Sequence, residues 1–413
     1  MKKKILSIAI MATIALAATA CAADEEEYGA DSTVESGFEV SDDSKAEAEE
    51  TSVETAAAET SVSEAEKTPE ETKEPVKEEK PALPETDADF FVYEQKTDGT
   101  IKITDMKKDS ALEVVVVPKE IDGAAVTEIG DDAFERYDSI TTLVIPDSVT
   151  QLGESLCEED FNLTSVVLPS NLTYLPSRAF TGCTSLASIE IPDTVTEMGY
   201  EVFMDCTGLT SVKIPDSVTE IGQFIFYGCT NLTSVNIPDG VKDIKGAFSD
   251  CSSLVSVDIP DSVEEMDYAF RGCSSLTSVK IPDKVSCLTE TFCDCSSLTS
   301  IEIPDKVEWY SGVFTGCSSL TSIEIPQTDG WVDYQEFSGC SSLTSIEVPE
   351  GITDIQTYAF KDCTGLKSIK LPASLTGIEE TAFEGCSSLE VVYAPEGSYA
   401  EEWAKAQGIK VEH

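Results

Sequence analysis

Apolar residues recur along the chain in a fixed order with a period of 22 or 23 residues, beginning at Phe134. Each unit has an aromatic position, a leucine six residues later and a proline six residues after the leucine, with Cys157 and Ile140 as exceptions. The distance from aromatic position to proline never changes, because the single-residue deletions all fall between a proline and the next aromatic position. The invariant half of each unit is therefore the packed half, and the variable half is a connecting arc. The prolines are Pro146, Pro169, Pro192, Pro215, Pro238, Pro260, Pro282, Pro304, Pro326, Pro349, Pro372 and Pro395.

The segment before each proline has the alternation of a short β-strand. In residues 320–326 (LTSIEIP), the apolar Ile323 and Ile325 alternate with the polar Ser322 and Glu324. The proline ends the strand because it has no N–H for the ladder. The A-F-x-x-C segment is too short for an ordinary helix and predicts a helical turn or a short 3-10 piece.

No single unit can bury its own apolar face, so the repetition predicts a stack of units with one continuous core. We expect a solenoid of about twelve repeats, with a parallel β-sheet on one face, its strands about 4.8 Å apart. The other face would carry short turns and loops. The phenylalanines would form a stacked aromatic core.

Ten of the fourteen cysteines form a column three residues after the aromatic position. This position calls for a small, buried, weakly donating side chain, so we interpret the column as packing. Disulfides between rungs are the alternative in an exported protein, although each rung would have to distort to form one. The ten are Cys183, Cys206, Cys229, Cys251, Cys273, Cys295, Cys317, Cys340, Cys363 and Cys386.

A metal site is a further alternative for the cysteines. Zinc needs ligands that converge on one point, whereas the column spreads its sulfurs along a line. Cys287, Cys293 and Cys295 are close in sequence, but three thiols without a histidine are a weak signal for a soft metal. We expect no metal and no cofactor.

The repeat units resemble those of a known family. CTSLASIEIPDTVTEMGYEVF and CTGLTSVKIPDSVTEIGQFIF are similar to the leucine-rich repeats of BspA-like bacterial surface proteins. The resemblance covers roughly residues 90–413 and implies a leucine-rich-repeat solenoid that acts in recognition at the cell surface. The segment from Gly99 is similar to the β-rich start of that family. PEGSYAEEWAKAQGIKV is similar to its C-terminal end, where Ser398 and Glu401 form an S-x-x-E capping box and predict a short helix over the last repeat.

The N-terminus has the features of an export signal. Three lysines at positions 2–4 precede an apolar run of 16 residues, which is shorter than the about 20 residues of a transmembrane helix. The A-T-A sequence at 18–20 before Cys21 resembles a lipobox, although Ala18 stands where leucine is usual. The same sequence also fits an ordinary signal peptidase site. A lipid on Cys21 would anchor the exported chain at the cell surface without spanning the membrane.

Residues 22–86 have 22 acids, 5 lysines and few apolar groups, a composition that cannot bury enough surface to fold. We expect an extended acidic tether. The predicted organisation is a signal peptide at 1–20, a lipidation site and acidic linker at 21–86, a β-rich cap at 87–127, repeats at 128–395, and a capping helix and strand at 396–413.

Charge and histidine content exclude several functions. The net charge of −51 argues against nucleic acid and anionic membrane surfaces as partners, because both are polyanions. The one histidine is His413, so Ser-His-Asp and Cys-His mechanisms lack their imidazole. A thiol such as Cys293 would have no base to activate it. We therefore expect that the protein is not an enzyme.

An aromatic patch is the first candidate binding surface. Five residues after each proline the side chain is usually polar, but in three successive repeats it is Cys287, Trp309 and Trp331, with Tyr310 and Tyr334 nearby. Aromatic side chains on an acidic column favour stacking with a protein or a sugar. In the alternative interpretation, Trp331 turns inward, because Asp329 stands where Val307 and its equivalents would fill the core.

The outward-facing strand position, on the expected concave face, is the second candidate surface. Concave faces of solenoids are where ligands usually dock. Its mixed charges fit a polar protein or a glycan, and they fit a solvated sheet equally well. The candidates are Glu190, Lys213, Asn236, Asp258, Lys280, Glu302, Glu324, Glu347 and Lys370.

These patterns predict a monomeric, lipid-anchored recognition protein that binds an extracellular protein or glycan, in adhesion to a host or to other cells. Many copies on one surface could make weak contacts effective through avidity. The alternative is a structural spacer or envelope component without a specific ligand.

Overall fold

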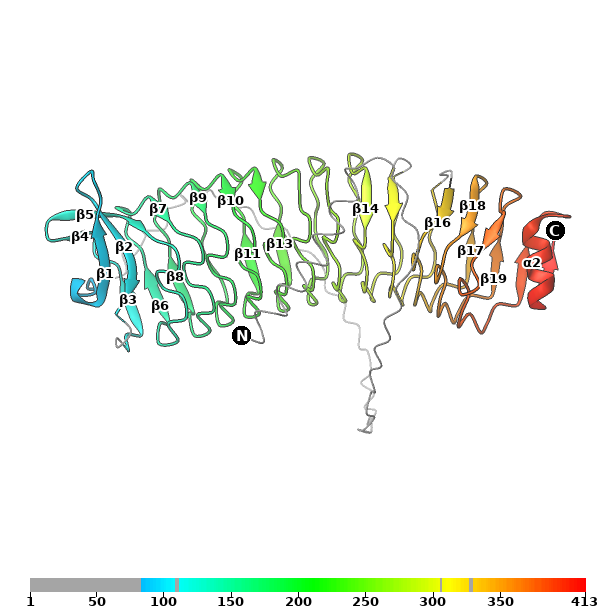
Figure 1. Cartoon of the computed structure of the whole chain (residues 1–413), viewed down its shortest axis with the longest axis horizontal. Helices are drawn as coiled ribbons and strands as arrows, with labels where there is room; N and C mark the ends of the chain where they lie inside the picture. The colour runs from blue at the N-terminus through cyan, green and yellow to red at the C-terminus, as the bar shows by residue number, and fades with distance from the viewer. Residues whose placement is uncertain (1–82, 108–110, 305–306, 327–329) are drawn as a thin grey trace, which may run out of the picture. The chain divides into compact units, whose positions relative to one another are not determined.

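The computed structural model describes residues 83–413 except 108–110, 305–306 and 327–329, and it does not describe the side chains of Trp309 and Tyr310. The predicted signal peptide, Cys21 and all but the end of the linker lie outside the described residues. From 83 onward the chain winds into successive coils that stack in sequence order (Figure 1). This is the predicted leucine-rich-repeat solenoid, and the fold class is confirmed.

The first end of the stack is closed by β-structure. Strands β1 and β2 form an antiparallel pair, and β2 pairs with β5. Strand β5 pairs in parallel with β7 (Gln151–Leu152) of the first full repeat. A 3-10 turn at Ala88–Phe90 precedes β1. Because β3 also pairs in parallel with β6 (Thr142–Val144), the cap contributes a rung of its own. These elements are β1 (Phe91–Gln95), β2 (Ile101–Met106), β3 (Val114–Val116), β4 (Glu120–Ile121) and β5 (Ala124–Ile129).

Seven of the twelve repeats have the expected strand before their proline, and together these strands form a first strand column. Neighbouring rungs pair in parallel and in register, for example Val212 with Val235. In repeats of 22 residues the same segment runs alongside its neighbours without an assigned strand. The strands are β6 (Thr142–Val144), β8 (Ser165–Val167), β11 (Ser211–Lys213), β13 (Ser234–Asn236), β17 (Ser345–Glu347), β19 (Ser368–Lys370), β21 (Val391–Tyr393) and β22 (Lys410–Glu412).

The connecting arcs after the prolines form a second column of strands, in addition to the expected sheet. Its strands are only two to four residues long, and they pair in parallel with the equivalent arcs. They are β7 (Gln151–Leu152), β9 (Tyr174–Leu175), β10 (Glu197–Met198), β12 (Glu220–Ile221), β14 (Cys287–Thr289), β15 (Glu308–Tyr310), β16 (Gly330–Val332), β18 (Ile352–Ile355) and β20 (Gly377–Ile378).

The A-F-x-x-C segment is a series of tight turns. Around Phe180, for example, Arg178 has a φ of 58° and Gly182 a φ of 74°, so a regular helix cannot continue through either position. The residue two after the aromatic is usually glycine or aspartate, which tolerate this conformation best. Backbone bonds of the i to i+3 type remain, as from Cys183 N–H to the Phe180 carbonyl at 3.1 Å.

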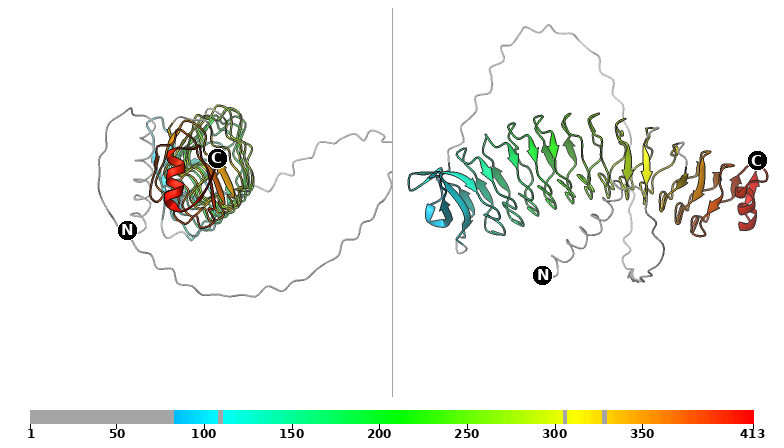
Figure 2. Two further views of the ribbon diagram at one scale, coloured as in Figure 1. Left: turned by 90° about the vertical axis from the view of Figure 1, so that its right-hand side faces the viewer. Right: turned by 45° about the horizontal axis from the view of Figure 1, so that its top comes forward.

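The phenylalanine column is the core of the stack. From Phe180 to Phe383, successive rings lie 5.1–6.0 Å apart between centroids and within 14° of parallel. The rings through Phe360 are fully buried. At the C-terminal end, Trp403 of α2 (Tyr399–Gln407) lies 5.0 Å from Phe383 and closes the stack. Figure 2 shows α2 lying across the end of the coils.

The last helix begins as the S-x-x-E sequence predicts. The Ser398 side chain accepts from Glu401 N–H at 3.2 Å, while the Glu401 carboxylate accepts from Gly397 N–H at 2.6 Å. The helix ends at Gly408, which has a φ of 74° and needs little energy to adopt it. The reciprocal bonds satisfy backbone donors that the first turn of a helix otherwise leaves unpaired.

The cysteine column has the expected packing role. Each of its ten thiols donates to a backbone carbonyl of the preceding repeat at 3.0–3.3 Å; Cys206, for example, donates to Phe180. The same Phe180 carbonyl also accepts from the backbone of Cys183. Burial raises the pKa of Cys206 and of nearly all the other column thiols. The thirteen cysteines of the described chain are all free.

Candidate binding surfaces

The outward positions of the first strand column lie on the surface, as expected. All nine side chains proposed for the concave face, from Glu190 to Lys370, are exposed. Several already have partners within the sheet: Lys370 pairs with Glu347 at 2.5 Å, and the Asn236 amide bonds both backbone groups of Ile214. This face therefore offers a polar surface of mixed sign without an enclosed site.

The two tryptophans of the predicted aromatic patch have different positions in the second strand column. Trp331 pairs with Asp354 and is 59% exposed, whereas the following Val332 is buried. The interpretation that Trp331 fills the core is therefore wrong. Trp309 pairs with the buried Leu288, and Cys287 pairs with Glu308.

This register corrects the expectation that Cys287, Trp309 and Trp331 share one column. The arcs from Pro282 to Phe292 and from Pro304 to Phe314 have the same length, so counting from the proline does not reveal this one-residue shift in pairing. The side chains of Trp309 and Tyr310 lie outside what the structure describes, and their part in a patch remains a prediction.

Two tyrosines of the same and the following repeat also reach the surface, at least in part. Tyr334, in the same arc, is 44% exposed. Its ring lies 6.2 Å from that of Tyr358 in the next repeat, and the Lys361 ammonium lies 4.6 Å from the centre of the Tyr358 ring. We call Trp331, Tyr334 and Tyr358 the Trp331 patch. Tyr358 was missed in the sequence because it lies two residues before a phenylalanine, at a position where residue type varies freely.

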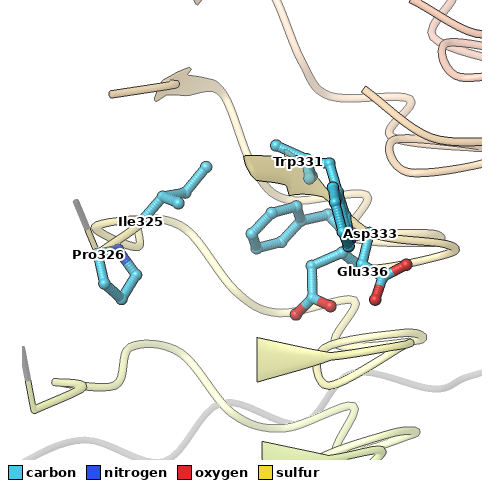
Figure 3. Close-up of a pocket in the computed structure, with 7 residues that line it drawn as sticks. Ile325, Pro326, Trp331, Asp333 and Glu336 are labelled. Carbon is cyan, nitrogen blue, oxygen red and sulfur yellow. The ribbon is translucent and has the colours of Figure 1, made fainter. Parts of the chain in front are cut away.

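A small cavity of about 40 Å³ lies beneath Trp331. Its apolar walls are Ile325, Pro326, Val332 and Phe337, and its polar groups are Asp333 and Glu336. Figure 3 shows both carboxylates close to the indole of Trp331.

Glu336 is the unusual member of this cavity. It is 2% exposed, and neither carboxylate oxygen has a hydrogen-bond partner among the described residues. Burial and the charge of Asp333 raise its pKa to about 8. The nearby Val313 N–H opposes this rise but makes no hydrogen bond of normal geometry with either oxygen.

Asp333 is held firmly in place. One oxygen accepts from its neighbour Tyr334 N–H at 2.6 Å, and the other accepts from Ser311 N–H of the preceding repeat at 3.1 Å. These bonds fix a half-buried carboxylate at the cavity, since each oxygen can still accept from a further donor.

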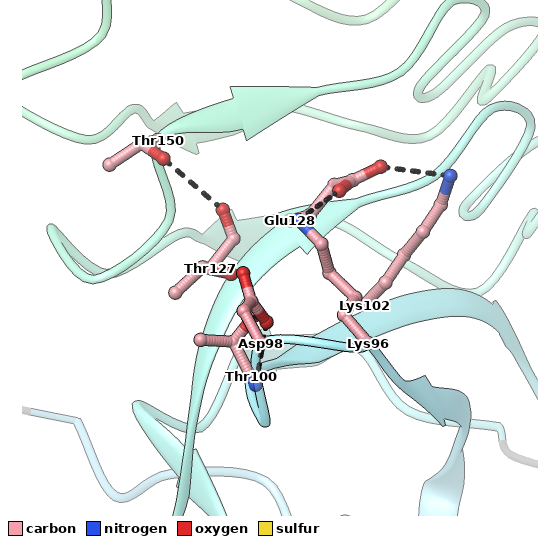
Figure 4. A network of polar contacts seen from close by, with 7 residues as sticks. All are labelled: Lys96, Asp98, Thr100, Lys102, Thr127, Glu128 and Thr150. Carbon is pink, nitrogen blue, oxygen red and sulfur yellow. Dashed lines mark hydrogen bonds and ion pairs between the residues drawn. The ribbon is translucent and has the colours of Figure 1, made fainter.

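A second, polar groove of about 390 Å³ lies where the cap meets the repeats. Lys102, Asp131, Gln151 and Tyr174 line it together with Glu128. The Glu128 carboxylate pairs with Lys96 at 2.7 Å and Lys102 at 2.9 Å (Figure 4). The charges of Glu128, Lys96 and Lys102 are therefore already paired with one another.

No described group of three or more His, Cys, Asp or Glu side chains is arranged to hold a metal ion. Cys287 and Cys293 contact Asp267 and Asp294, respectively, at 3.8 and 3.7 Å. Within the described ranges, no helix has the length and apolar character needed to cross a membrane.

The stacked rungs, the leucine and phenylalanine columns and the open surfaces define a leucine-rich-repeat protein. The family described as "BspA type Leucine rich repeat region" matches in six copies, over 120–232, 150–267, 196–317 and 309–401, and the chain belongs to this family. Repeat proteins of this kind are generally binding scaffolds, and no catalytic family is indicated. No curated protein matches the chain.

Solved bacterial structures have the same fold. A leucine-rich repeat protein from Bacteroides ovatus is 25% identical, with a TM-score of 0.62 over 79% of this chain and 99% of that one. A leucine rich cell surface protein from Faecalibacterium prausnitzii is 27% identical, with a TM-score of 0.58 over 81% of this chain and 99% of that one. The pneumococcal vaccine antigen PcpA, 16% identical, has a TM-score of 0.52 over 78% of this chain and 99% of that one, and shows the fold alone.

Proposed function

We propose that the protein is exported, is anchored through a lipid on Cys21, and binds an extracellular protein through its solenoid in adhesion to a host or to other cells. Family membership supports a binding role, and a similar solved protein is described as a cell surface protein. The export signal and Cys21 are features of the sequence.

The observation that carries the proposal is the exposure of Trp331 on a rigid stack. A tryptophan that is 59% exposed leaves a large apolar surface in water, which is unfavourable unless a partner covers it. Buried tryptophans are typical of the energetic centres of protein interfaces. Trp331 lies in β16, which pairs with β18 of the following repeat, so less ordering of its backbone would be needed on binding.

The acidic linker fits the same role. With 22 acids against 5 lysines in 65 residues, like charges should keep residues 22–86 extended. Such a tether would hold the solenoid away from the membrane and let several copies bind one opposing surface.

The test compares cells that display the full chain with cells that display Trp331→Ala. Host-cell adhesion should fall by about tenfold or more, because interface tryptophans often contribute over 1.4 kcal/mol. Tyr200→Ala is the matched control, since Tyr200 is 61% exposed but outside the patch, and its adhesion should not change. Equal surface amounts of each variant are verified by antibody staining.

Unchanged adhesion by a folded Trp331→Ala variant would rule out the patch. Failure of the wild-type chain to bind any host extract or glycan array would favour the structural spacer, and binding to glycans alone would replace the protein partner by a sugar. The anchor is tested separately: Cys21→Ala should lose palmitate labelling, and retained labelling would contradict it.

A further inference from the structure

The arc before Phe337 has an acid at a position that belongs to the core. In other repeats, the residue immediately before the aromatic is small or apolar, and Glu336 is the one charged member of this column. The other members are Ala133, Leu156, Ala179, Val202, Ile225, Ala247, Ala269, Thr291, Val313, Ala359 and Ala382. A carboxyl group therefore occupies a site that an alanine would fill without cost.

The described residues provide no hydrogen-bond donor to the Glu336 carboxyl group. A buried polar group without a hydrogen bond destabilises the folded state, and a buried ionised one destabilises it more. Neither oxygen of Glu336 has a partner among the described residues, and the side chain lines the cavity beneath Trp331. A cation that enters this cavity would offset the cost and would favour the ionised form.

The chemistry of the cavity selects among cations. Calcium requires six to eight oxygen ligands, but only Asp333 and Glu336 of the seven lining residues have side-chain oxygens. The Asp333 oxygens also already accept two backbone N–H groups. A guanidinium is planar and rigid, and a cavity of about 40 Å³ offers room for a few water-sized groups only.

An alkylammonium ion fits these features. Its charge can meet Glu336 and Asp333, its methylene groups can contact Ile325 and Pro326, and the indole of Trp331 can lie over the cation. Contact of an ammonium group with an indole face adds further attraction.

We propose that the cavity beneath Trp331 binds the ammonium group of a primary alkylamine, and that its natural source is a lysine side chain on the protein partner. Binding of the amine itself requires no partner protein. Identification of the source as a partner lysine rests on the proposed function.

Binding should be coupled to loss of a proton from Glu336. The ionisable groups that interact with it are Asp333 in its own arc, which raises its pKa, and the thiol of Cys340, whose pKa Glu336 raises in turn. The residues of the same column in the two adjacent repeats, Val313 and Ala359, carry no charge. Below about pH 8 the ammonium must therefore displace the proton of Glu336 into solvent.

The experiment is isothermal titration of the full chain with Nα-acetyl-lysine amide. Nα-acetyl-norleucine amide, which has the same apolar stem without the ammonium, is the matched control ligand and should not bind measurably. The wild-type affinity should rise about tenfold per pH unit between about pH 6 and pH 7.5 and level off above pH 8. Repeating the titration in buffers of different ionisation enthalpy should show proton release.

Glu336→Gln should weaken amine binding about tenfold or more at pH 8.5, and should abolish both the pH dependence and the proton release. Gln is nearly isosteric with the neutral acid, so this variant should fold, which circular dichroism verifies. Asp160→Asn is the matched control, because Asp160 is also a buried acid but lies far along the chain from the cavity. It should bind the amine as the wild type does.

Three results would overturn the inference: equal binding of the norleucine ligand, displacement of the amine by calcium or potassium at matched ionic strength, or no amine binding at any soluble concentration. If amine binding fails while Trp331→Ala still abolishes adhesion, the inference is wrong and the proposed function stands. If amine binding holds while adhesion does not depend on Trp331, only the lysine source is wrong.

Discussion

Two buried carboxyl groups, one near each end of the stack, have the same chemistry and different surroundings. Asp160 takes the place of a column cysteine in an early repeat, and Glu336 takes the place of a small apolar residue in a late one. Burial raises the pKa of each to about 8. One oxygen of Asp160, however, accepts from Tyr137 N–H at 2.6 Å, whereas Glu336 has no such partner among the described residues.

The contacts around Asp160 belong to the junction between cap and repeats. Tyr137, which Asp160 holds, donates its hydroxyl to Asp105 at 2.7 Å and to the Met106 carbonyl at 2.5 Å, both in β2 of the cap. Asp160 is thus part of a bonded structural network, while Glu336 faces a cavity. Burial, a raised pKa and an oxygen without a partner among the described residues are common to both acids. Glu336 differs because neither of its oxygens has a partner and because it lines a cavity.

The largest expected effect comes from breaking the stack between these two regions. Phe248 lies 5.8 Å from Phe226 and 5.6 Å from Phe270 between ring centroids. Phe248→Ala should lower the free energy of unfolding by about 3–5 kcal/mol, because it removes a buried ring from both contacts. Urea denaturation followed by circular dichroism measures the change.

In a stack stabilised by nearest neighbours, a lesion in the middle should also separate the unfolding of the two ends. The Tyr200→Ala variant serves as the control, since loss of this exposed ring should change stability by less than about 0.5 kcal/mol. A Phe248→Ala variant as stable as this control would show that the aromatic column does not hold the two regions together.

The next effect is a change in stability that has opposite signs when each of the two acids is replaced by alanine. Asp160→Ala should destabilise the fold by about 1–3 kcal/mol, because Tyr137 N–H loses its acceptor inside the core. Glu336→Ala should stabilise it by about 1–3 kcal/mol at pH 8, because an unpartnered carboxyl group is removed and alanine is common at this position. Thermal unfolding of both variants at pH 8 measures the two shifts, and shifts of the same sign would refute the distinction.

The architecture could be predicted because the same pattern of residue types recurs in twelve repeats. Phenylalanine, leucine, cysteine and proline each recur at one position, so a chance occurrence in one unit cannot mislead. The second strand column escaped prediction because pairs such as Glu220–Ile221 are too short to show a period. The positive φ of residues such as Arg178 has no signature in the sequence, since the neighbouring rungs impose it.

Only part of the candidate site could be predicted from the sequence. Trp331 stood out as an aromatic residue on an acidic column, and the structure places it in solvent. Glu336 could have been found as the single acid in a column of small residues. The cavity itself could not, because it depends on how side chains of adjacent segments pack. The one-residue shift that pairs Trp309 with Leu288 occurs between arcs of equal length, so counting from the proline does not reveal it.

The last prediction concerns how the free energy of unfolding changes with pH, and it tests directly whether the two acids differ. The pKa of Glu336 is about 8 in the folded chain and has an ordinary value of 4.5. Between these values the folded state keeps a proton that the unfolded state has lost, so stability should fall as pH rises, by roughly 1.4 kcal/mol per unit at most. Relative to Glu336→Gln, the wild type should lose stability from about pH 5 to pH 8 and no further above it.

Asp160 has the same sign, since its pKa rises from 3.8 to about 8, and Asp160→Asn should remove a similar slope. The two acids should separate when Nα-acetyl-lysine amide is added at pH 8. The ligand should restore stability in wild type and in Asp160→Asn, because it binds the folded state with Glu336 ionised, and it should have no effect on Glu336→Gln. Equal stabilisation of all three proteins would place the amine elsewhere and leave Glu336 as a structural acid like Asp160.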